Sequence, residues 1–287
     1  MTKMFRFHAL LFATLLGLAS PAAAQQPAAQ PIRASKIILV GDSTTAVTSG
    51  WGSSFCANHV MSTMACLNLA RGGRSTSSYR AEGSWDIALA EMRTTGYSAV
   101  WVLIQFGHND QPNKPGRSTD LETEFPANLR RYIAEARAAG ARPVLVTPLA
   151  RRQFRDGVLD NNLEPWSQAI RTVAAETGVP LVDLNARSVA AVQAMGPALA
   201  TQFAQFPPSR EQAAAALTGT TAPLPAATPS PAPTAPEQRA AGAEPMGRPR
   251  LVFDYTHLGR TGADFFAAIV AHELARAAPE MRRFLVP

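Results

Sequence analysis

Residues 36–44 have the sequence KIILVGDST, in which a run of apolar side chains ends abruptly at Gly41-Asp42-Ser43. A continuous apolar run of this kind is typical of a strand buried on both faces of a parallel sheet. A sharp turn after Val40 would present the Ser43 hydroxyl at the carboxyl end of the strand, where open α/β sheets place their active sites. The stretch therefore predicts an α/β fold and offers Ser43 as a candidate nucleophile.

A candidate base and its orienting acid lie far along the chain, in Asp254-Tyr255-Thr256-His257. At a separation of three residues, a helical turn would place both side chains on one face, so that the carboxylate could orient the imidazole. Ser43, His257 and Asp254 would then form a catalytic triad. Each motif alone is weak, because Gly-Asp-Ser is commonly a plain turn and Asp-x-x-His a surface pair.

Two further segments could supply an oxyanion hole. NLARGGRS (68–75) follows the apolar stretch 64–67, and IQFGHND (104–110) follows the apolar run 99–103. Adjacent glycines let a backbone N–H approach a ligand closely. We therefore expect Ser43, Gly73 and Asn109 to stand together at the carboxyl ends of neighbouring strands and to bind a developing negative charge.

With these four blocks in order, the chain resembles the SGNH (GDSL-type) hydrolases. Within them it looks most like the rhamnogalacturonan acetylesterase group, on the segments Gly50-Trp51-Gly52, Gly73-Arg74-Ser75, FGHND (106–110) and TPLARRQF (147–154). The similarity covers most of the chain from about Lys36 onward. The resemblance implies hydrolysis of acetyl esters on polysaccharide, with the N–H groups of Ser43 and Gly73 and the amide of Asn109 as the oxyanion hole.

Helical and strand patterns alternate along the chain, which favours a three-layer α/β/α sandwich with a five-stranded parallel sheet in a flavodoxin-like order. The expected strands are 37–40, 65–67, 100–104, 143–147 and 181–183. The expected helices are 53–61, 84–93, 125–139, 165–177, 188–195 and 261–276. Left-handed stops are expected at Gly96, Gly140 and Gly178, and Asp156-Gly157 predicts a hairpin.

One domain, residues 36–287, is expected, because 46% hydrophobic and 17% charged residues are enough for a substantial core. Residues 207–249 carry ten of the 23 prolines among Ala, Thr and Ser, which predicts a disordered insertion within that domain.

The first residues predict a secretory signal peptide, residues 1–24, followed by a tail, 25–35. Lys3 and Arg6 precede the apolar stretch 9–19, and Ala22-Ala23-Ala24 supplies small residues for cleavage. The apolar stretch is shorter than the ~20 residues that span a bilayer, so we expect no stable membrane insertion and a secreted or periplasmic protein.

The formal charge of +6 is modest, and the arginines are scattered without a continuous basic stripe, so a nucleic-acid partner is not expected. Cys56 and Cys66 could form a disulfide in an oxidising compartment, or remain buried thiols. The chain has no zinc-type spacing of Cys and His, so no metal or other cofactor is expected. A monomer is favoured.

Several neighbours of these motifs are expected to be structural. His108 and Asp110 are interpreted as supports of the Asn109 turn. Arg74 is interpreted as half of a salt bridge, although it could also contact a uronate carboxylate. Trp51, Tyr79 and Trp85 are interpreted as core residues, although aromatic rings could also stack on sugars.

Three function classes stay open. The first is a carbohydrate O-acetylesterase acting on an acetylated polysaccharide, with pectin or rhamnogalacturonan as the expected substrate. The second is a lipase, thioesterase or arylesterase on the same fold, and the third is a catalytically silent carbohydrate-binding protein. Fold alone does not choose between them.

Overall fold

The computed structural model describes residues 33–224 and 252–286. Its centre is a five-stranded parallel sheet in the order β2-β1-β3-β4-β7. The strands are β1 (Ser35–Gly41), β2 (Met64–Asn68), β3 (Val100–Gln105), β4 (Arg142–Val146) and β7 (Leu181–Val182). This confirms the flavodoxin-like order and each of the five expected strands.

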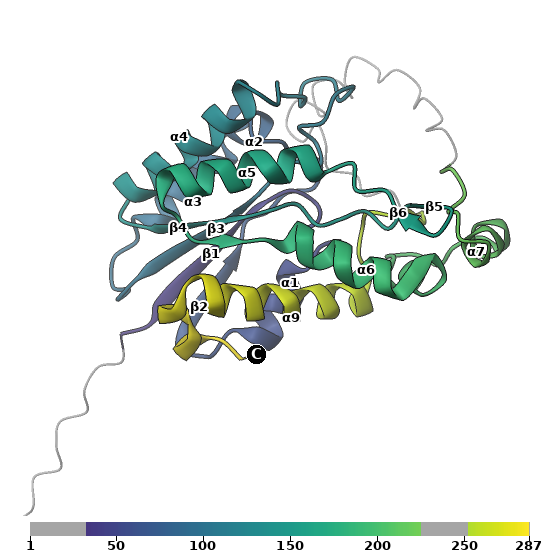
Figure 1. The fold of residues 1–287 in the computed structure, drawn as a ribbon. Coiled ribbons are helices and arrows are strands. Elements are labelled where there is room, and N and C mark those ends of the chain that lie inside the picture. Colours follow the sequence, from purple (N-terminus) through teal and green to yellow (C-terminus); the bar gives the residue numbers. More distant parts are fainter. Residues whose placement is uncertain (1–32, 225–251, 287) are drawn as a thin grey trace, which may run out of the picture. The chain divides into compact units, whose positions relative to one another are not determined.

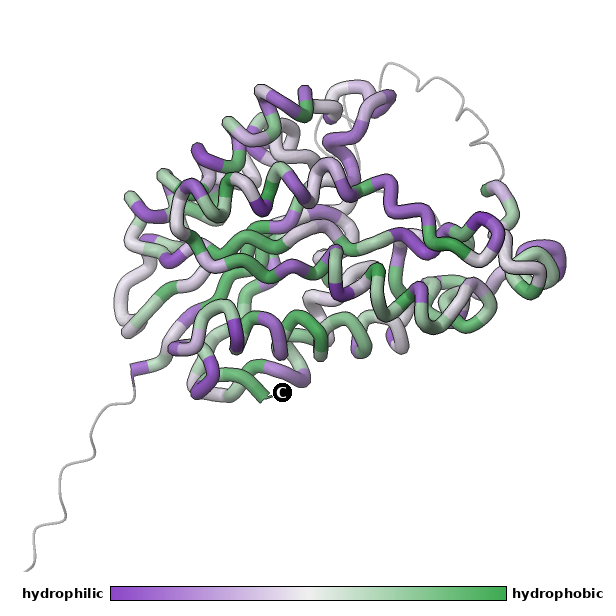
Figure 2. Tube along the Cα trace, in the orientation of Figure 1, coloured by the Kyte–Doolittle hydropathy of each residue, from purple (hydrophilic) through white to green (hydrophobic). Residues whose placement is uncertain are grey.

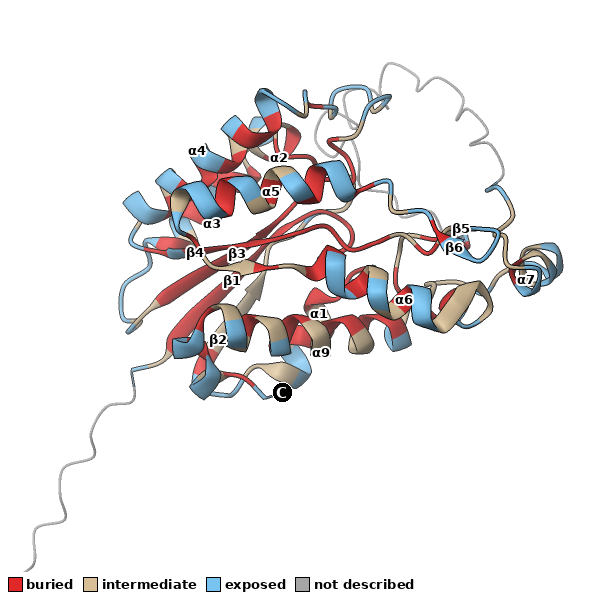
Figure 3. Cartoon of the chain, viewed as in Figure 1, coloured by how far each residue is buried: buried red, intermediate tan, exposed pale blue. Residues whose placement is uncertain are grey.

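Both faces of the sheet are covered by helices (Figure 1). Side chains along β1 alternate between the two faces, since Ile37 and Leu39 belong to one hydrophobic cluster and Ile38 and Val40 to the other. All four are fully buried, which explains the unbroken apolar run. Figures 2 and 3 show the same strands as the most hydrophobic and most buried part of the chain.

One face is packed by α3 (Ser84–Met92), α4 (Glu124–Ala138) and α5 (Glu164–Thr177), and the other by α1 (Gly52–Ser54), α6 (Leu184–Ala200) and α9 (Arg260–Ala277). Short elements complete this part, namely a π-helical turn (Phe55–His59), α2 (Ser78–Ala81) and two 3₁₀ turns (Thr201–Phe203 and Pro279–Phe284). The long helices begin and end within a few residues of the expected positions.

The predicted stops and hairpin are also present. Gly96, Gly140 and Gly178 all have positive φ, as a left-handed helix stop requires. The hairpin is formed by β5 (Phe154–Arg155) and β6 (Val158–Leu159), and the two residues of its turn, Asp156 and Gly157, have φ of 50° and 77°.

The expectation of disorder from Pro207 onward is wrong for the first part of that segment. Residues 210–217 form α7 (Arg210–Leu217), which packs on α6. Ser209 and Gln212 form a capping box at its start, in which each side chain accepts a hydrogen bond from the backbone N–H of the other residue. This capping favours a helix in a segment whose proline-rich composition predicts disorder. Thr221 then hydrogen-bonds the backbone of Phe154 in the hairpin. The remainder of the predicted insertion, 225–249, lies outside the described residues, as do the predicted signal peptide and most of the tail.

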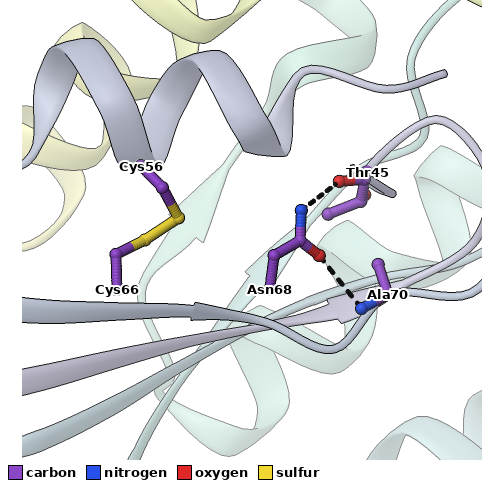
Figure 4. The surroundings of a disulfide bond; sticks show 5 residues. All are labelled: Thr45, Cys56, Cys66, Asn68 and Ala70. Carbon is purple, nitrogen blue, oxygen red and sulfur yellow. Dashed lines mark hydrogen bonds between the residues drawn. A yellow bond between two sulfur atoms is a disulfide. The ribbon is translucent and has the colours of Figure 1, made fainter. Parts of the chain in front are cut away.

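Cys56 and Cys66 form a disulfide, which decides between the two possibilities left open by the sequence. It joins the π-helical turn to β2 (Figure 4). Next to it, Asn68 donates to the carbonyl of Thr45 at 2.9 Å and accepts from the Ala70 N–H at 3.0 Å, so the end of β2 is tied to the turn after β1. Among the described helices, none is both long and apolar enough to cross a membrane.

Candidate active site

The turn that carries Ser43 is built by buried hydrogen bonds directly after β1. The Asp42 carboxylate accepts from the Thr44 N–H at 2.9 Å and from the Thr44 hydroxyl at 2.8 Å. Burial opposes ionisation of Asp42, but the nearby His108 and these two bonds hold its pKa below the ordinary value. Ser43 is therefore fixed on a tight turn by its two neighbours.

The segment Gly50-Trp51-Gly52 packs against the backbone of this turn. A Cβ atom at Gly50 would lie 2.3 Å from the Thr44 carbonyl oxygen, so only glycine fits there. Trp51 donates from its indole to Gln105 at 2.8 Å, and Gln105 in turn donates to the Thr44 hydroxyl at 2.5 Å. The motif thus supports the turn that carries Ser43, and the Trp51 ring is buried in the core.

His257 and Asp254 meet, but not in the helical turn that their spacing suggested. They lie in an irregular loop before α9, where Asp254 Oδ1 accepts from the N–H groups of Thr256 and His257, both at 2.7 Å. Asp254 Oδ2 is 2.6 Å from His257 Nδ1. A carboxylate that bonds the backbone two and three residues ahead closes a tight loop, which brings the two side chains together as a helix would.

Asp254 is held in its ionised form. Burial raises its pKa, but the bonds and charge of His257 and the two backbone N–H groups lower it to about 2. With Nδ1 occupied by the carboxylate, Nε2 is the ring nitrogen left to face a nucleophile.

The loop is tied to the Ser43 turn by two further bonds. The Leu258 N–H donates to the Ser49 carbonyl at 2.9 Å, and the Ser49 hydroxyl donates to the Ser43 carbonyl at 2.8 Å. Ser43 and His257 line the same cavity, with no direct hydrogen bond between them among the described residues. Such a bond commonly tightens only when substrate is bound.

Arg152 anchors the same loop by hydrogen bonds to its backbone. The sequence motif that contains Arg152 gave no indication of this role. The Arg152 side chain is 1% exposed. Its guanidinium donates to the carbonyls of His257 at 2.8 Å, Thr256 at 3.2 Å and Asp254 at 3.3 Å, and its backbone N–H donates to Tyr255 at 2.8 Å. One residue thereby holds the backbone of all four residues of the Asp-x-x-His motif.

Gly73 and Asn109, the expected oxyanion donors, lie shortly after the ends of β2 and β3. Gly73 has a φ of 78°, a conformation that favours glycine. The N–H groups of Ser43 and Gly73 donate to no group in the described ranges. The Asn109 amide donates one hydrogen to the Arg74 carbonyl at 3.1 Å, which leaves its second hydrogen available.

The residues interpreted as structural have that role. Asp110 accepts from the N–H groups of Thr76 at 2.9 Å and Gly107 at 3.1 Å, so it pins the turn that carries Asn109. His108 is buried with Nδ1 3.3 Å from Asp42, a contact too poorly aligned to count as a hydrogen bond, and burial lowers its pKa. Arg74 is paired with Glu82 at 2.9 Å, as expected, and Tyr79 and Trp85 are also in the core.

The cavity that unites these groups has a volume of about 600 Å³. It is lined by Ser43, Gly73, Asn109 and His257, with the cations Arg74, Lys114, Arg117 and Arg151 around them. Lys114 and Arg117 were missed by sequence reasoning, since no motif marks them. A second hollow lies over α6 and α9 and contains neither a serine nor a cysteine.

A serine, a carboxylate-bound histidine and groups that can donate hydrogen bonds line one cavity, an arrangement that fits a serine hydrolase of the SGNH type. Residues 39–265 match the GDSL-like Lipase/Acylhydrolase family, so the chain belongs to this family and is a serine esterase.

Among its relatives, the chain is 37% identical over 164 residues to the probable rhamnogalacturonan acetylesterase YesY of Bacillus subtilis, which covers 55% of this chain and 73% of the relative. It is also 37% identical over 170 residues to the rhamnogalacturonan acetylesterase RhgT of the same organism, over 56% of this chain and 70% of the relative. These relatives confirm the resemblance to that group.

A solved structure shares the fold. The crystal structure of the YxiM protein of Bacillus subtilis superimposes with a TM-score of 0.56 at 23% identity. The match covers 86% of this chain and 58% of the YxiM chain, so this chain spans less than two thirds of that protein.

Proposed function

We propose that this protein is a carbohydrate O-acetylesterase that removes acetyl groups from acetylated pectin or rhamnogalacturonan. The observation that carries the proposal is the convergence of Ser43, His257, Gly73 and Asn109 on one cavity. The two relatives named as rhamnogalacturonan acetylesterases support the choice of substrate.

In the proposed mechanism, His257 Nε2 takes the proton of the Ser43 hydroxyl as its oxygen attacks the acetyl carbonyl. Asp254 holds the opposite nitrogen and stabilises the charged ring. The N–H groups of Ser43 and Gly73 and the Asn109 amide bind the oxyanion, and one such donor is commonly worth ~3 kcal/mol. His257 returns the proton to the departing sugar oxygen, and water then releases acetate from Ser43 by the same sequence.

We also propose that the enzyme acts outside the cytoplasm after removal of residues 1–24. The Cys56–Cys66 disulfide supports this location, because disulfides persist in oxidising compartments. When the full chain is expressed in a bacterial host and the exported protein is collected, N-terminal sequencing should show a mature chain that begins at Gln25.

Acetate release from a panel of acetylated polysaccharides tests the function. We expect faster release from acetylated rhamnogalacturonan or pectin than from acetylated xylan, and little cleavage of octanoyl esters. The Ser43→Ala variant is the control for release that does not depend on this site. Faster turnover of octanoyl than acetyl esters would instead favour the lipase alternative, and a several-fold preference for xylan would contradict the pectin assignment.

A further inference from the structure

The lining of the cavity is strongly basic. It includes the side chains of Lys114, Arg117, Arg151 and Arg74, and among residues 33–224 and 252–286 it includes no Asp or Glu. Arg74 is neutralised by its ion pair with Glu82. None of the other three forms an ion pair with a carboxylate in the described ranges, so the cavity holds three cations with no counter-charge in contact.

These three side chains come from two neighbouring loops. Lys114 and Arg117 follow β3, and Arg151 follows β4, the next strand of the sheet. Both loops lie at the carboxyl edge of the sheet, so the cations stand on the β3 and β4 side of Ser43.

The three cations differ in the hydrogen bonds that they make. The Arg117 guanidinium makes long contacts of 3.4 Å with the Gly73 carbonyl and with the Asn109 side-chain oxygen, beside the oxyanion donors. Arg151 donates to the Asn162 side chain at 2.6 Å. The Lys114 ammonium has no hydrogen-bond partner within residues 33–224 and 252–286.

The grouping is electrostatically unfavourable as it stands. Burial, together with the charges of Arg151 and Arg117, lowers the pKa of Lys114, so Lys114 is repelled by both arginines. Burial also lowers the pKa of Arg151, even though more distant carboxylates oppose the shift. Partly buried like charges are stabilised by an anion, and a carboxylate fits this need with a single charge and two acceptor oxygens.

We propose that Lys114, Arg117 and Arg151 form a subsite that binds the carboxylate of a uronic acid residue in the glycan, next to the acetylated sugar. This inference rests on the proposed function, and it assigns the preference for acidic glycans to these three residues. Recognition by charge would distinguish uronate polymers from neutral acetylated glycans, whereas the triad and oxyanion donors treat the acetyl group alike in both.

Paired substrates test the subsite. Acetylated oligogalacturonides are compared with the same oligosaccharides after reduction of their carboxyl groups to primary alcohols, and kcat/KM is measured for acetate release. We expect the wild type to favour the acidic member by about tenfold or more, as one or two charge-assisted hydrogen bonds would give. Added NaCl should raise KM for the acidic member and leave KM for the reduced member nearly constant.

Variants assign the preference to residues. Lys114→Gln and Arg151→Gln should each lower the ratio of the two kcat/KM values several-fold, and Lys114→Glu should lower it further by repelling the carboxylate. Arg93→Gln is the matched control, because Arg93 is an exposed cation at the end of α3, remote from the cavity lining. It should keep the wild-type ratio.

The outcomes separate the two proposals. Equal kcat/KM for the acidic and reduced oligosaccharides would overturn the subsite and leave the acetylesterase function intact. A preference that survives in Lys114→Gln, Arg151→Gln and their double variant would also overturn it. Hydrolysis of aryl acetates without acetate release from any oligosaccharide would overturn the proposed function and the subsite with it.

Discussion

Replacing Arg152 by Met should damage both stability and turnover, because this one side chain holds the loop of the proposed base. Its guanidinium bonds three carbonyls, those of Asp254, Thr256 and His257. At about 1 kcal/mol for each lost bond, the free energy of unfolding would fall by about 3 kcal/mol. Burial of the guanidinium, which lowers its pKa to about 10, opposes folding and offsets part of this loss. We therefore expect a loss of about 2 kcal/mol and a lower melting temperature by roughly 4 to 8 °C.

The catalytic effect follows from geometry. Arg152 does not line the cavity, so its loss should leave KM for an aryl acetate nearly unchanged. A shift of about 1 Å in the position of His257 would cost about a hundredfold in kcat, and we expect a fall of roughly 10- to 100-fold. Arg152→Lys keeps the charge but not the planar fork of donors, so its kcat should lie between those of the wild type and Arg152→Met.

The assay is steady-state hydrolysis of an aryl acetate at a temperature where circular dichroism shows each variant folded. Arg155→Met is the matched control, because Arg155 is exposed on the hairpin strand β5. Wild-type kcat and melting temperature in Arg152→Met would refute the reasoning. A lower melting temperature with unchanged kcat would show that Arg152 stabilises the fold without positioning His257.

Other expectations test the triad, its pH dependence and the proline-rich segment. Ser43→Ala and His257→Ala should each lower kcat by about 10⁴-fold or more while remaining folded, and Asp254→Asn should leave a larger residual rate. Wild-type turnover by folded Ser43→Ala would exclude the mechanism. Because the pKa of Asp254 is lowered to about 2, its ionised form stabilises the fold above about pH 4, and this stabilisation of roughly 2 kcal/mol is lost as the pH falls toward 2. Urea unfolding of wild type and Asp254→Asn at pH 6 and pH 3 should show that difference shrinking. Replacing residues 226–250 with a short Gly/Ser linker should change the melting temperature little, since their composition offers few apolar residues to a core.

The sheet could be predicted from sequence because its strands are buried on both faces. The run from Ile37 to Val40 has no polar position, and each face of β1 contributes to a separate cluster. Helix α7 was not predicted, although Ser209 and Gln212 have the spacing of a capping box at its start. The surrounding prolines dominated the composition, and a helix of eight residues carries too little periodicity to outweigh them.

The sequence led to residues that the structure brings together at one cavity, but not to all of the geometry that brings them together. Ser43, Gly73 and Asn109 line one cavity because β1, β2 and β3 are parallel and end at the same edge of the sheet. His257 reaches this cavity from the loop before α9, which is tied to the Ser43 turn. The helical turn at Asp254 was wrong, because a separation of three residues fits a tight loop as well as a helix. Arg152 could not have been assigned its role, since its carbonyl partners lie 102 to 105 residues further along the chain.

Arg151 and Arg152 are adjacent in sequence but belong to different parts of the site. They lie in the irregular segment between β4 and β5, and their side chains have different surroundings. Arg151 and Gln153 line the cavity, whereas Arg152 is buried against the His257 loop. Substitution should therefore separate the two effects. Loss of the Arg151 charge should change the preference between acidic and neutral substrates, whereas loss of Arg152 should lower kcat on both. The short segment between β4 and β5 would thus contribute both to substrate selection and to the placement of the base.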